Sequence, residues 1–425
     1  MPYDVIVIGA GLAGFMAAEA ACEKGARVLI LARGMGTLPL TSGCIDVLGY
    51  FPTASPVPLS SPLGALNRLR EFHPHHPYSK LGAEKIISAL ERFRELARAD
   101  SIPYCGRFDS NILIPTALGT FHPTCLAPET MKKGDLSLPG RVLIVGFEGL
   151  KDFSAPLTAE NLNLLQAGGK ISPSFRAKTL PETDWGFKAL TTLNLAGALD
   201  REDVRDRLAR RIRPLLNPGE KVGLPAVLGF HSSHRAWADL QEKLAAEIFE
   251  VPLPPPSIAG LRLYNLFRSR LRAKGVRIII GLSVLQPLIE GNEIRGIGLG
   301  ESRKSPAYRA PAYVLATGKF VGGGLDTRPD RVFETLLDLP VSHPPSRKDW
   351  FNQELLTPAG QPFNSFGVEV NEDLQPVDSR GRVLYRNLFA AGGILAHADS
   401  MAEKSGGGVA IATGYAAGRL AANKN

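Results

Sequence analysis

The sequence is poor in cysteine, and none of its cysteines has the spacing of a metal or cluster site. It contains four in 425 residues, and no two of them form a C-x-x-C pair. Zinc and iron–sulfur ligation are therefore not expected, and this usage fits a reducing compartment. The four positions are Cys22, Cys44, Cys105 and Cys125.

The sequence also lacks a long uncharged apolar run and a strong charge imbalance. No stretch of about eighteen such residues is present, so no membrane-spanning helix is expected, and no signal peptide precedes the first expected strand at Asp4. The net charge is +8, and the cations are scattered apart from residues 201–213, which argues against nucleic acid as a partner. We expect a cytoplasmic protein that reaches a membrane only through a partner.

What the sequence does contain is a large apolar fraction and alternating strand and helix patterns. The length of 425 residues predicts two or three domains. Hydrophobic residues make up 44% of the chain, which suits a globular enzyme with a large core, and we expect its substrate to be a small molecule. We expect an α/β fold with a discontinuous nucleotide-binding domain, residues 1–110 and 256–425. Residues 111–255 would form an inserted cap or substrate domain, which residues 325–370 could extend.

A glycine-rich turn lies between a strand and a helix at the start of the chain. The β-branched run Asp4–Ile8 leads into GAGLAG, and a helix over Leu12–Glu23 and a second strand over Arg27–Leu31 follow. In such a unit the glycines permit a tight turn, close approach of a pyrophosphate and close helix packing, and the helix N-terminus faces the phosphates. The unit predicts a dinucleotide site. Its expected contacts are Gly9, Ala10, Gly11, Leu12, Ala13 and Gly14.

An acidic residue is missing where the second strand ends. A carboxylate there would bind the ribose hydroxyls, whereas an arginine can accommodate a 2′-phosphate. The sequence has Ala32 and Arg33 at this place. This stretch alone leaves FAD, NADP and a shortened flavin open.

Three later stretches favour flavin over NADP. They are a polar turn at residues 41–43, an apolar strand over Ala312–Ala316 that ends in Thr-Gly, and a closing strand–GG–loop–GGG–helix over residues 388–421. A glycine-rich helix N-terminus can stabilise the negative charge that a flavin gains on reduction, and an NADP dehydrogenase does not need this closing motif. The further expected cofactor contacts are Arg33, Ser42, Gly43, Thr317, Gly318, Gly392, Gly393, Gly406, Gly407, Gly408 and Val409.

Candidates for proton transfer are fewer, and each has a structural alternative. His122 lies in FHPT, and His-Pro-Thr also occurs in the flavin subunits of succinate dehydrogenases and fumarate reductases. His397, Asp399 and Lys404 lie in the loop before the closing helix. The histidines at 73, 75 and 76 are interrupted by prolines and have no carboxylate cluster nearby, so no metal site is expected.

Several intervening elements are also predicted from periodicity. The arginines at 268, 270 and 272 are expected on a solvated helix face. The expected elements are a helix over Gly82–Asp100, hairpins over Tyr104–Leu126, strands over Arg141–Val145 and Leu190–Leu195, a helix over Val204–Arg213, a strand over Val222–Leu228 and a helix from Ser257 to Lys274.

The order and spacing of these motifs resemble the B subunits of anaerobic glycerol-3-phosphate dehydrogenases. The resemblance covers nearly the whole chain, and its more specific parts are SGCIDVLG, HPYSKLG and VGFEGLKDF. It implies a Rossmann-like FAD/NAD(P)-binding fold with an inserted cap. It also implies bound flavin, and the B subunit is usually credited with FMN, whereas the intact glycine fingerprint favours FAD.

The same resemblance implies a reaction and partners. Such enzymes oxidise sn-glycerol 3-phosphate to dihydroxyacetone phosphate and pass electrons to quinone, with a flavoprotein A subunit and an iron–sulfur C subunit that attaches the complex to the cytoplasmic face of the membrane. It supplies no catalytic residue. The residues themselves leave open a stand-alone dehydrogenase or reductase of the fumarate-reductase type and an assembly protein without cofactor.

Overall fold

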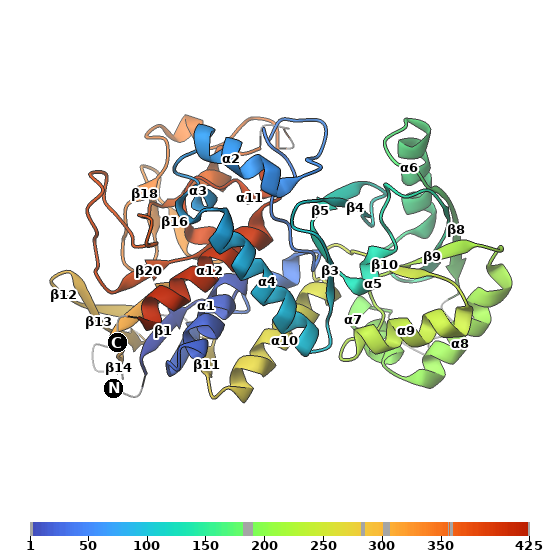
Figure 1. Cartoon of the computed structure of the whole chain (residues 1–425), viewed down its shortest axis with the longest axis horizontal. Helices are drawn as coiled ribbons and strands as arrows, with labels where there is room; N and C mark the ends of the chain where they lie inside the picture. Colours follow the sequence, from blue (N-terminus) through green and yellow to red (C-terminus); the bar gives the residue numbers. More distant parts are fainter. Residues whose placement is uncertain are drawn as a thin grey trace. The chain divides into compact units, whose positions relative to one another are not determined.

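The computed structural model describes residues 3–181, 190–281, 285–300, 307–355, 357 and 360–423. The chain divides into two compact units. Unit 1 comprises Met1–Leu38, Ile45–Phe93 and Tyr264–Asn425, and unit 2 comprises Pro39–Cys44 and Arg94–Leu263. Each unit combines a parallel sheet with helices (Figure 1).

A five-stranded parallel sheet, in the order β11-β2-β1-β15-β20, forms the centre of unit 1. Its inner strands are short apolar runs that are buried along their whole length, as parallel strands covered on both faces must be. The predicted strands of the first glycine unit, of the segment that ends in ATG (residues 316–318) and of the closing motif are confirmed. The bounds are β1 (Val5–Ile8), β2 (Val28–Ala32), β11 (Arg277–Ile280), β15 (Ala312–Leu315) and β20 (Leu388–Ala390).

The first and last long helices of the chain, α1 (Leu12–Glu23) and α12 (Gly406–Ala422), pack against each other beside this sheet. Figure 1 shows the red α12 alongside the blue α1. Small residues allow this approach: a Cβ atom at Gly418 would lie 2.1 Å from the Ala17 carbonyl oxygen. The other helices with residues in unit 1 are α2 (Pro62–Phe72), α3 (Pro77–Leu81), α4 (Ala83–Ala99), α10 (Ile258–Ala273) and α11 (Ser400–Glu403).

Smaller antiparallel elements complete unit 1. After β11, the strands β12 (Leu285–Glu290) and β13 (Glu293–Leu299) pair as a ribbon, which β14 (Ala307–Tyr308) joins. Residues 325–370 also belong to unit 1. They contain the pairs β16 (Leu325–Thr327) with β17 (Val332–Glu334), and β18 (Val341–Ser342) with β19 (Gly367–Val368).

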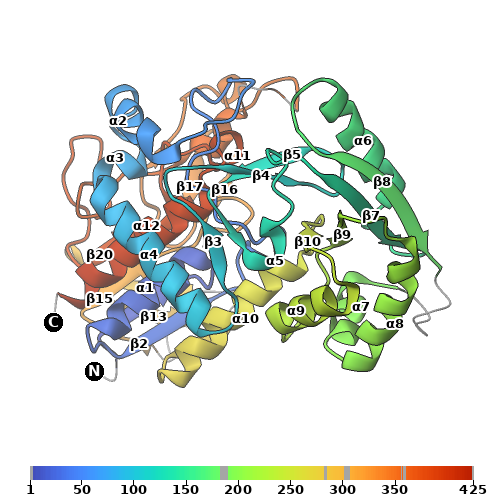
Figure 2. The same cartoon turned by 45° about the vertical axis from the view of Figure 1, so that its right-hand side comes forward.

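Unit 2 has its own four-stranded parallel sheet, in the order β10-β9-β7-β8 (Figure 2). Helices α6 (Ala155–Ala167), α7 (Thr192–Leu199), α8 (Glu202–Ile212) and α9 (Ser233–Leu244) accompany it. The strands are β7 (Arg141–Phe147), β8 (Ser174–Leu180), β9 (Glu220–Pro225) and β10 (Ile248–Val251). Two antiparallel pairs and a short helix precede the sheet: β3 (Tyr104–Gly106) with β6 (Leu126–Pro128), β4 (Ile112–Pro115) with β5 (Phe121–Thr124), and α5 (Glu129–Lys132).

The strand predicted over Leu190–Leu195 is wrong, because this stretch begins helix α7. Thr191 caps the helix, and its hydroxyl oxygen accepts a hydrogen bond from the Asn194 N–H. Leu195, Ala196 and Leu199 are buried at helical spacing. A short leucine-rich run fits both a strand and a buried helix, so its own pattern could not decide.

The solvated face predicted for the α10 arginines is also wrong in part. Glu19 on α1 is completely buried, and its carboxylate accepts hydrogen bonds from Arg270 Nε at 3.2 Å and Lys274 Nζ at 2.6 Å. Arg268 is half-buried, and only Arg272 of the three predicted arginines is exposed. A buried carboxylate needs such cations to offset its desolvation, so α10 is tied to α1 by charge.

Candidate cofactor site

The turn after β1 can be made only by glycine. Gly9 has φ of +121°, and a Cβ atom there would lie 2.2 Å from the Ala316 carbonyl oxygen at the end of β15. A Cβ atom at Gly14 would lie 2.1 Å from the Gly9 carbonyl oxygen. The first and third glycines therefore let β1, β15 and α1 approach one another.

The second glycine has a different environment. Gly11 is the N-cap of α1 and no side chain caps the helix there. A Cβ atom at Gly11 would meet nothing within 4 Å. Open space beside a helix N-terminus is what close approach of a phosphate requires. The predicted contacts Ala10, Leu12 and Ala13 surround this glycine in sequence and are themselves buried.

The end of β2 turns back toward this glycine loop. Gly36 has φ of +67°, and a Cβ atom there would lie 2.8 Å from the Gly11 Cα. Arg33 is exposed, and its Nη1 atom would lie 3.1 Å from a Cβ atom at Gly323, in the loop that follows β15. A guanidinium group therefore lies near the carboxyl edge of the sheet. It follows β2, where the sequence has no carboxylate to bind a ribose.

The loop that follows β15 folds tightly on itself. A Cβ atom at Gly324 would lie 1.9 Å from the Gly318 carbonyl oxygen, and one at Gly322 would lie 2.4 Å from the Thr317 carbonyl oxygen. Among the residues that the structure describes, the buried Thr317 hydroxyl oxygen has no hydrogen-bond partner. Buried hydroxyls are normally satisfied, so this orphan group fits a bound ligand.

The turn after β20 joins the glycine loop to the ATG loop. Gly392 has φ of +75°, its N–H donates to the Thr413 hydroxyl at 2.8 Å, and a Cβ atom there would lie 2.5 Å from the Ala13 Cβ. A Cβ atom at Gly393 would lie 3.7 Å from the Gly318 Cα. The structure thus brings the glycine unit, the ATG loop and the GG turn to one edge of the unit 1 sheet.

The GGG segment at the start of α12 packs against residues 45–47. The Gly408 N–H donates to the Asp46 carbonyl at 2.8 Å, and a Cβ atom at Gly408 would lie 2.1 Å from the Tyr78 hydroxyl. Ser405 stands at the N-cap position but donates its hydroxyl to Glu403 Oε2 at 2.7 Å and leaves the helix uncapped by a side chain. Val409 is buried, and its N–H bonds the Ser405 carbonyl.

Two predicted contacts, Ser42 and Gly43, belong to unit 2. A Cβ atom at Gly43, which has φ of +83°, would lie 2.6 Å from the Ala259 Cβ. The Gly43 carbonyl accepts from the Tyr104 hydroxyl at 2.5 Å, and the Ser42 hydroxyl accepts from the Cys44 N–H at 3.1 Å. These contacts give both residues a structural role within unit 2, and a role toward a cofactor stays a prediction.

A buried group of charged and polar side chains, which the sequence did not single out as a unit, lies before α12. Glu403 accepts from His76 Nε2 at 3.2 Å, from Ser405 and from the Asp399 N–H at 3.2 Å. Burial opposes ionisation of Glu403, but these hydrogen bonds outweigh it and hold its pKa below the usual value. Lys319 donates to the carbonyls of Ala398, at 2.9 Å, and Asn364. We call Lys319, Asp399, Glu403 and His76 the charged cluster.

Within the charged cluster, burial acts on Asp399 and Lys319 in opposite directions. Burial raises the pKa of the Asp399 carboxyl, although two backbone N–H groups of α11 stabilise its ionised form. Burial lowers the pKa of the Lys319 ammonium to about 8, against the attraction of Asp399 and Glu403. The signal that could have found Lys319 is its place directly after the ATG segment, where a lysine follows Gly318.

The predicted proton-transfer candidates are spread over different elements. His122 lies on β5 of unit 2, opposite Ile114. His397 has φ of +66°, its Nε2 lies 2.7 Å from Glu369 Oε1, and its ring centre lies 5.5 Å from that of His75. Lys404 has φ of +52° and ends α11. Within the described part of the chain, no group of three His, Cys, Asp or Glu side chains could hold a metal ion.

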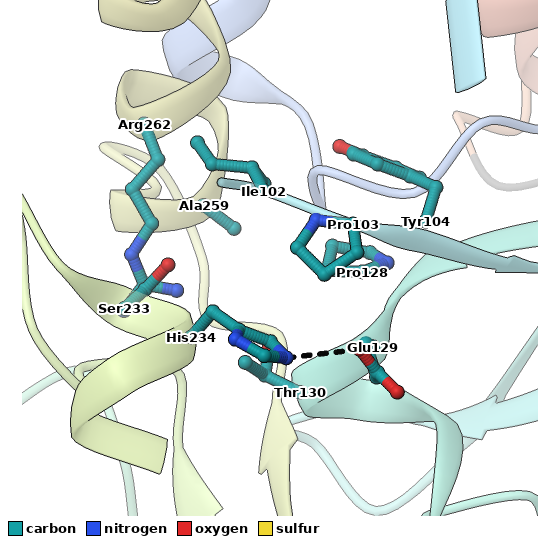
Figure 3. A pocket seen from close by; sticks show the side chains of 10 residues that line it. All are labelled: Ile102, Pro103, Tyr104, Pro128, Glu129, Thr130, Ser233, His234, Ala259 and Arg262. Carbon is teal, nitrogen blue, oxygen red and sulfur yellow. Dashed lines mark hydrogen bonds and ion pairs between the residues drawn. The ribbon is translucent and has the colours of Figure 1, made fainter. Parts of the chain in front are cut away.

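A small pocket lies wholly within unit 2 and does not resemble a flavin site. It has room for about one water molecule, with a volume of about 10 Å³. Figure 3 shows His234 pointing toward Glu129, and Nε2 lies 3.0 Å from Glu129 Oε2. The buried Arg262 is paired with Glu250 through two contacts of 2.8 and 2.9 Å. The charges in this pocket are therefore already paired.

Comparison with known proteins adds two kinds of similarity. The model of the family described as "FAD binding domain" matches residues 4–409. A Halobacterium salinarum protein, named as the probable B subunit of an anaerobic glycerol-3-phosphate dehydrogenase, is 35% identical over 99% of this chain and 97% of its own length. A Pectobacterium carotovorum protein, named as the B subunit of the same kind of dehydrogenase, is 33% identical over 97% and 96%.

Solved structures are more distant. A 3-ketosteroid-Δ4-(5α)-dehydrogenase from Rhodococcus jostii RHA1 is 14% identical, with a TM-score of 0.40, over 99% of this chain and 96% of that one. A likeness of this size supports no conclusion about activity. No helix in the described ranges combines the length and the apolar character needed to cross a membrane.

Proposed function

The chain belongs to the family of anaerobic glycerol-3-phosphate dehydrogenase B subunits, and we propose that it is the flavin-carrying subunit of such a dehydrogenase. Its FAD binding domain and its relatives make it a flavin oxidoreductase. The proposed reaction converts sn-glycerol 3-phosphate and a quinone to dihydroxyacetone phosphate and a quinol. The observation that carries the proposal is the 35% identity to a family member across 99% of the chain.

The residues at the edge of the unit 1 sheet fit a bound flavin. The open space at Gly11 suits a phosphate, and the orphan Thr317 hydroxyl could be satisfied by a ligand. The start of α12 offers the positive end of a helix dipole. A bound flavin would supply the hydride acceptor, and these groups would bind and orient it and stabilise developing negative charge.

Within this proposal we favour FMN over FAD. In place of a ribose-binding carboxylate, the end of β2 offers the Arg33 guanidinium, and Gly36 packs against Gly11. A guanidinium matches a phosphate in charge and geometry, and FMN ends in a phosphate monoester that carries its charge on one group. The intact glycine fingerprint is also compatible with FAD, so the identity of the flavin must be measured.

The proposed partners follow from the family. The relatives are named as B subunits, which implies a multi-subunit complex. We propose that a flavoprotein A subunit and an iron–sulfur C subunit complete it and that the C subunit attaches it to the cytoplasmic face of the membrane. The oxidation of glycerol phosphate would then occur on this subunit or on the A subunit, with this chain carrying electrons.

The first experiment is the absorbance spectrum of the gently purified chain, followed by mass determination of the cofactor released on denaturation. The proposal expects a flavin spectrum and the mass of FMN. Release of FAD would overturn the choice of FMN and keep the flavin assignment. A chain that purifies without flavin, and takes up neither FMN nor FAD when it is added, would leave an assembly role as the function.

A further inference from the structure

Lys319 occupies a special position between the predicted cofactor contacts and the charged cluster. It follows Gly318 directly, and its own backbone nitrogen would lie 3.9 Å from a Cβ atom at Gly393. Its side chain reaches the loop before α12, where Nζ donates to the Ala398 carbonyl at 2.9 Å. One residue therefore connects the ATG loop and the GG turn to the loop that leads into α12.

The hydrogen bonds of Lys319 can be kept in both of its charge states. Its Nζ atom donates to the backbone carbonyls of Ala398 and Asn364. A neutral amine still has two N–H donors for these carbonyls and gains a free lone pair, and an ammonium adds a third donor and a charge that Asp399 and Glu403 attract. Taking up a proton thus needs no rearrangement of the two loops.

The other members of the charged cluster are less suited to exchanging a proton. The Nδ1 atom of His76 accepts from the Tyr78 N–H at 3.1 Å and its Nε2 atom lies 3.2 Å from Glu403, so both ring nitrogens already have partners. Glu403 is held ionised by three hydrogen bonds, and Asp399 is fixed by the N–H groups that it caps. Lys404, the other cation next to this loop, lies at the end of α11. Burial, in contrast, brings the pKa of Lys319 to about 8.

We propose that in alkaline solution, where its amine is largely neutral, Lys319 takes up a proton when the bound flavin is reduced, so that the site gains no net charge. This inference rests on the proposed flavin function. A hydride from the alcohol carbon of a substrate carries two electrons and one proton and leaves one net negative charge on the cofactor. The Lys319 amine binds one proton from solvent and becomes an ammonium, and the hydroxyl proton of the substrate is released to solvent. Electrons, protons and charge therefore balance.

The test is a potentiometric titration of the flavin-loaded protein between pH 6 and pH 10. The number of protons bound per two electrons is read from the dependence of the midpoint potential on pH. Wild-type protein is expected to bind one more proton per two electrons at pH 9 than Lys319→Arg, whose guanidinium stays charged. At pH 6 the two should agree, because both side chains already carry a proton.

Two further variants sharpen the test. Lys319→Met should lose the additional proton and be harder to reduce at pH 7 than Lys319→Arg, because it brings no positive charge. Lys133→Arg, an exposed lysine of unit 2 that pairs with Glu247, should behave as wild type. A purely structural role would lower the thermal stability of the Lys319 variants and leave the proton count unchanged.

The outcomes separate this inference from the proposed function. Equal proton uptake at pH 9 in flavin-loaded wild type and Lys319→Arg overturns the role of Lys319 and leaves the flavin assignment intact. A chain that binds no flavin overturns the proposed function and this role with it, and that result is visible in the spectrum before any titration.

Discussion

At the scale of residues, Arg33 has the clearest consequence for binding. It is exposed, it follows β2, and its guanidinium lies beside the glycine loop after β15. A phosphate placed there would gain a charge-assisted contact, whereas a ribose diol would lose the carboxylate that usually accepts its hydrogen bonds. Arg33 should therefore matter for a cofactor phosphate and little for the flavin ring.

The first prediction follows from this difference. Arg33→Ala should weaken FMN binding about tenfold, or about 1.4 kcal/mol, which is close to the lower end of the usual range for a hydrogen bond to a charged group. Binding of riboflavin, which has no phosphate, should not change. Fluorescence titration of the apoprotein with both ligands measures this, and Arg380→Ala, at an exposed arginine elsewhere on unit 1, is the control. Equal losses for both ligands would contradict a phosphate contact.

The glycine motifs could be predicted from the sequence, but it could not show which glycines leave room for a ligand and which allow close packing. Gly11 borders open space, as a ligand-binding glycine should. Gly408 belongs to the motif expected to face the flavin, yet the Tyr78 hydroxyl and the backbone of residues 46–47 occupy the space that its side chain would need. The spacing of a motif does not show which distant segment packs against each glycine. For the same reason the sequence did not reveal the pairing of His76 with Glu403 or the contact of Lys319 with the Ala398 carbonyl.

At the scale of elements, the pair α1 and α12 holds the candidate site together. Cβ atoms at Gly414 and Gly418 would lie 2.4 Å and 2.1 Å from the carbonyl oxygens of Ala13 and Ala17. These distances involve backbone, which cannot move aside as a side chain can. The start of α1 and the start of α12 are thus fixed relative to each other by the absence of side chains.

The second prediction tests this contact. Gly418→Ala should destabilise the protein by about 2 kcal/mol, because the added methyl group forces the helices apart. Gly197→Ala in α7 is the matched control, since a Cβ atom there would meet nothing within 4 Å. The control should be neutral or stabilising by about 0.5–1 kcal/mol, as expected from helix propensity. Urea unfolding of both variants measures the difference, and similar destabilisation of both would contradict the packing argument.

The elements also show where sequence periodicity succeeds and where it fails. The strand of β-branched residues before GAGLAG and the amphipathic helix α4 have distinct periods, and both predictions are confirmed. The run over Leu190–Leu195 is short and leucine-rich, and the N-cap at Thr191 decides that it is helical. The charge pairing of Arg270 needs a partner 251 positions away in the sequence, so no local pattern could reveal it.

At the scale of the whole molecule, a buried ion pair should make the stability of unit 2 depend on acid. In unit 2, hydrogen bonds from Arg176 lower the pKa of Glu220 to about 2, although burial opposes them, and Asn217 adds to the effect. The folded-state pKa of Glu220 is thus below the unfolded value. The stabilisation is complete above about pH 4.5 and is lost as the pH falls toward 2.

The third prediction follows from this sign. Glu220→Gln should lower the stability of unit 2 by about 2 kcal/mol at pH 7, the usual size for hydrogen bonds to a charged group. The variant should also lose less stability than wild type between pH 4.5 and pH 2. Hydrogen exchange of the β9 amides, measured by mass spectrometry across this range, tests it. Glu290→Gln, at an exposed ion pair with Arg295, should match wild type, and an unchanged acid response in Glu220→Gln would contradict the assignment.

The order of the strands in unit 1 has a consequence for synthesis on the ribosome. The strand β1 pairs with β2 soon after both emerge, but its other neighbour, β15, lies about three hundred residues later, and β20 and α12 come last. Most of unit 2 is a single stretch of chain that is translated in between, and domains generally fold as units during translation. The glycine loop of the nascent chain therefore lacks its contacts with β15, β20 and α12 until almost the whole chain has been translated. A prematurely terminated chain that lacks α12 would leave unit 1 without the helix that packs on α1.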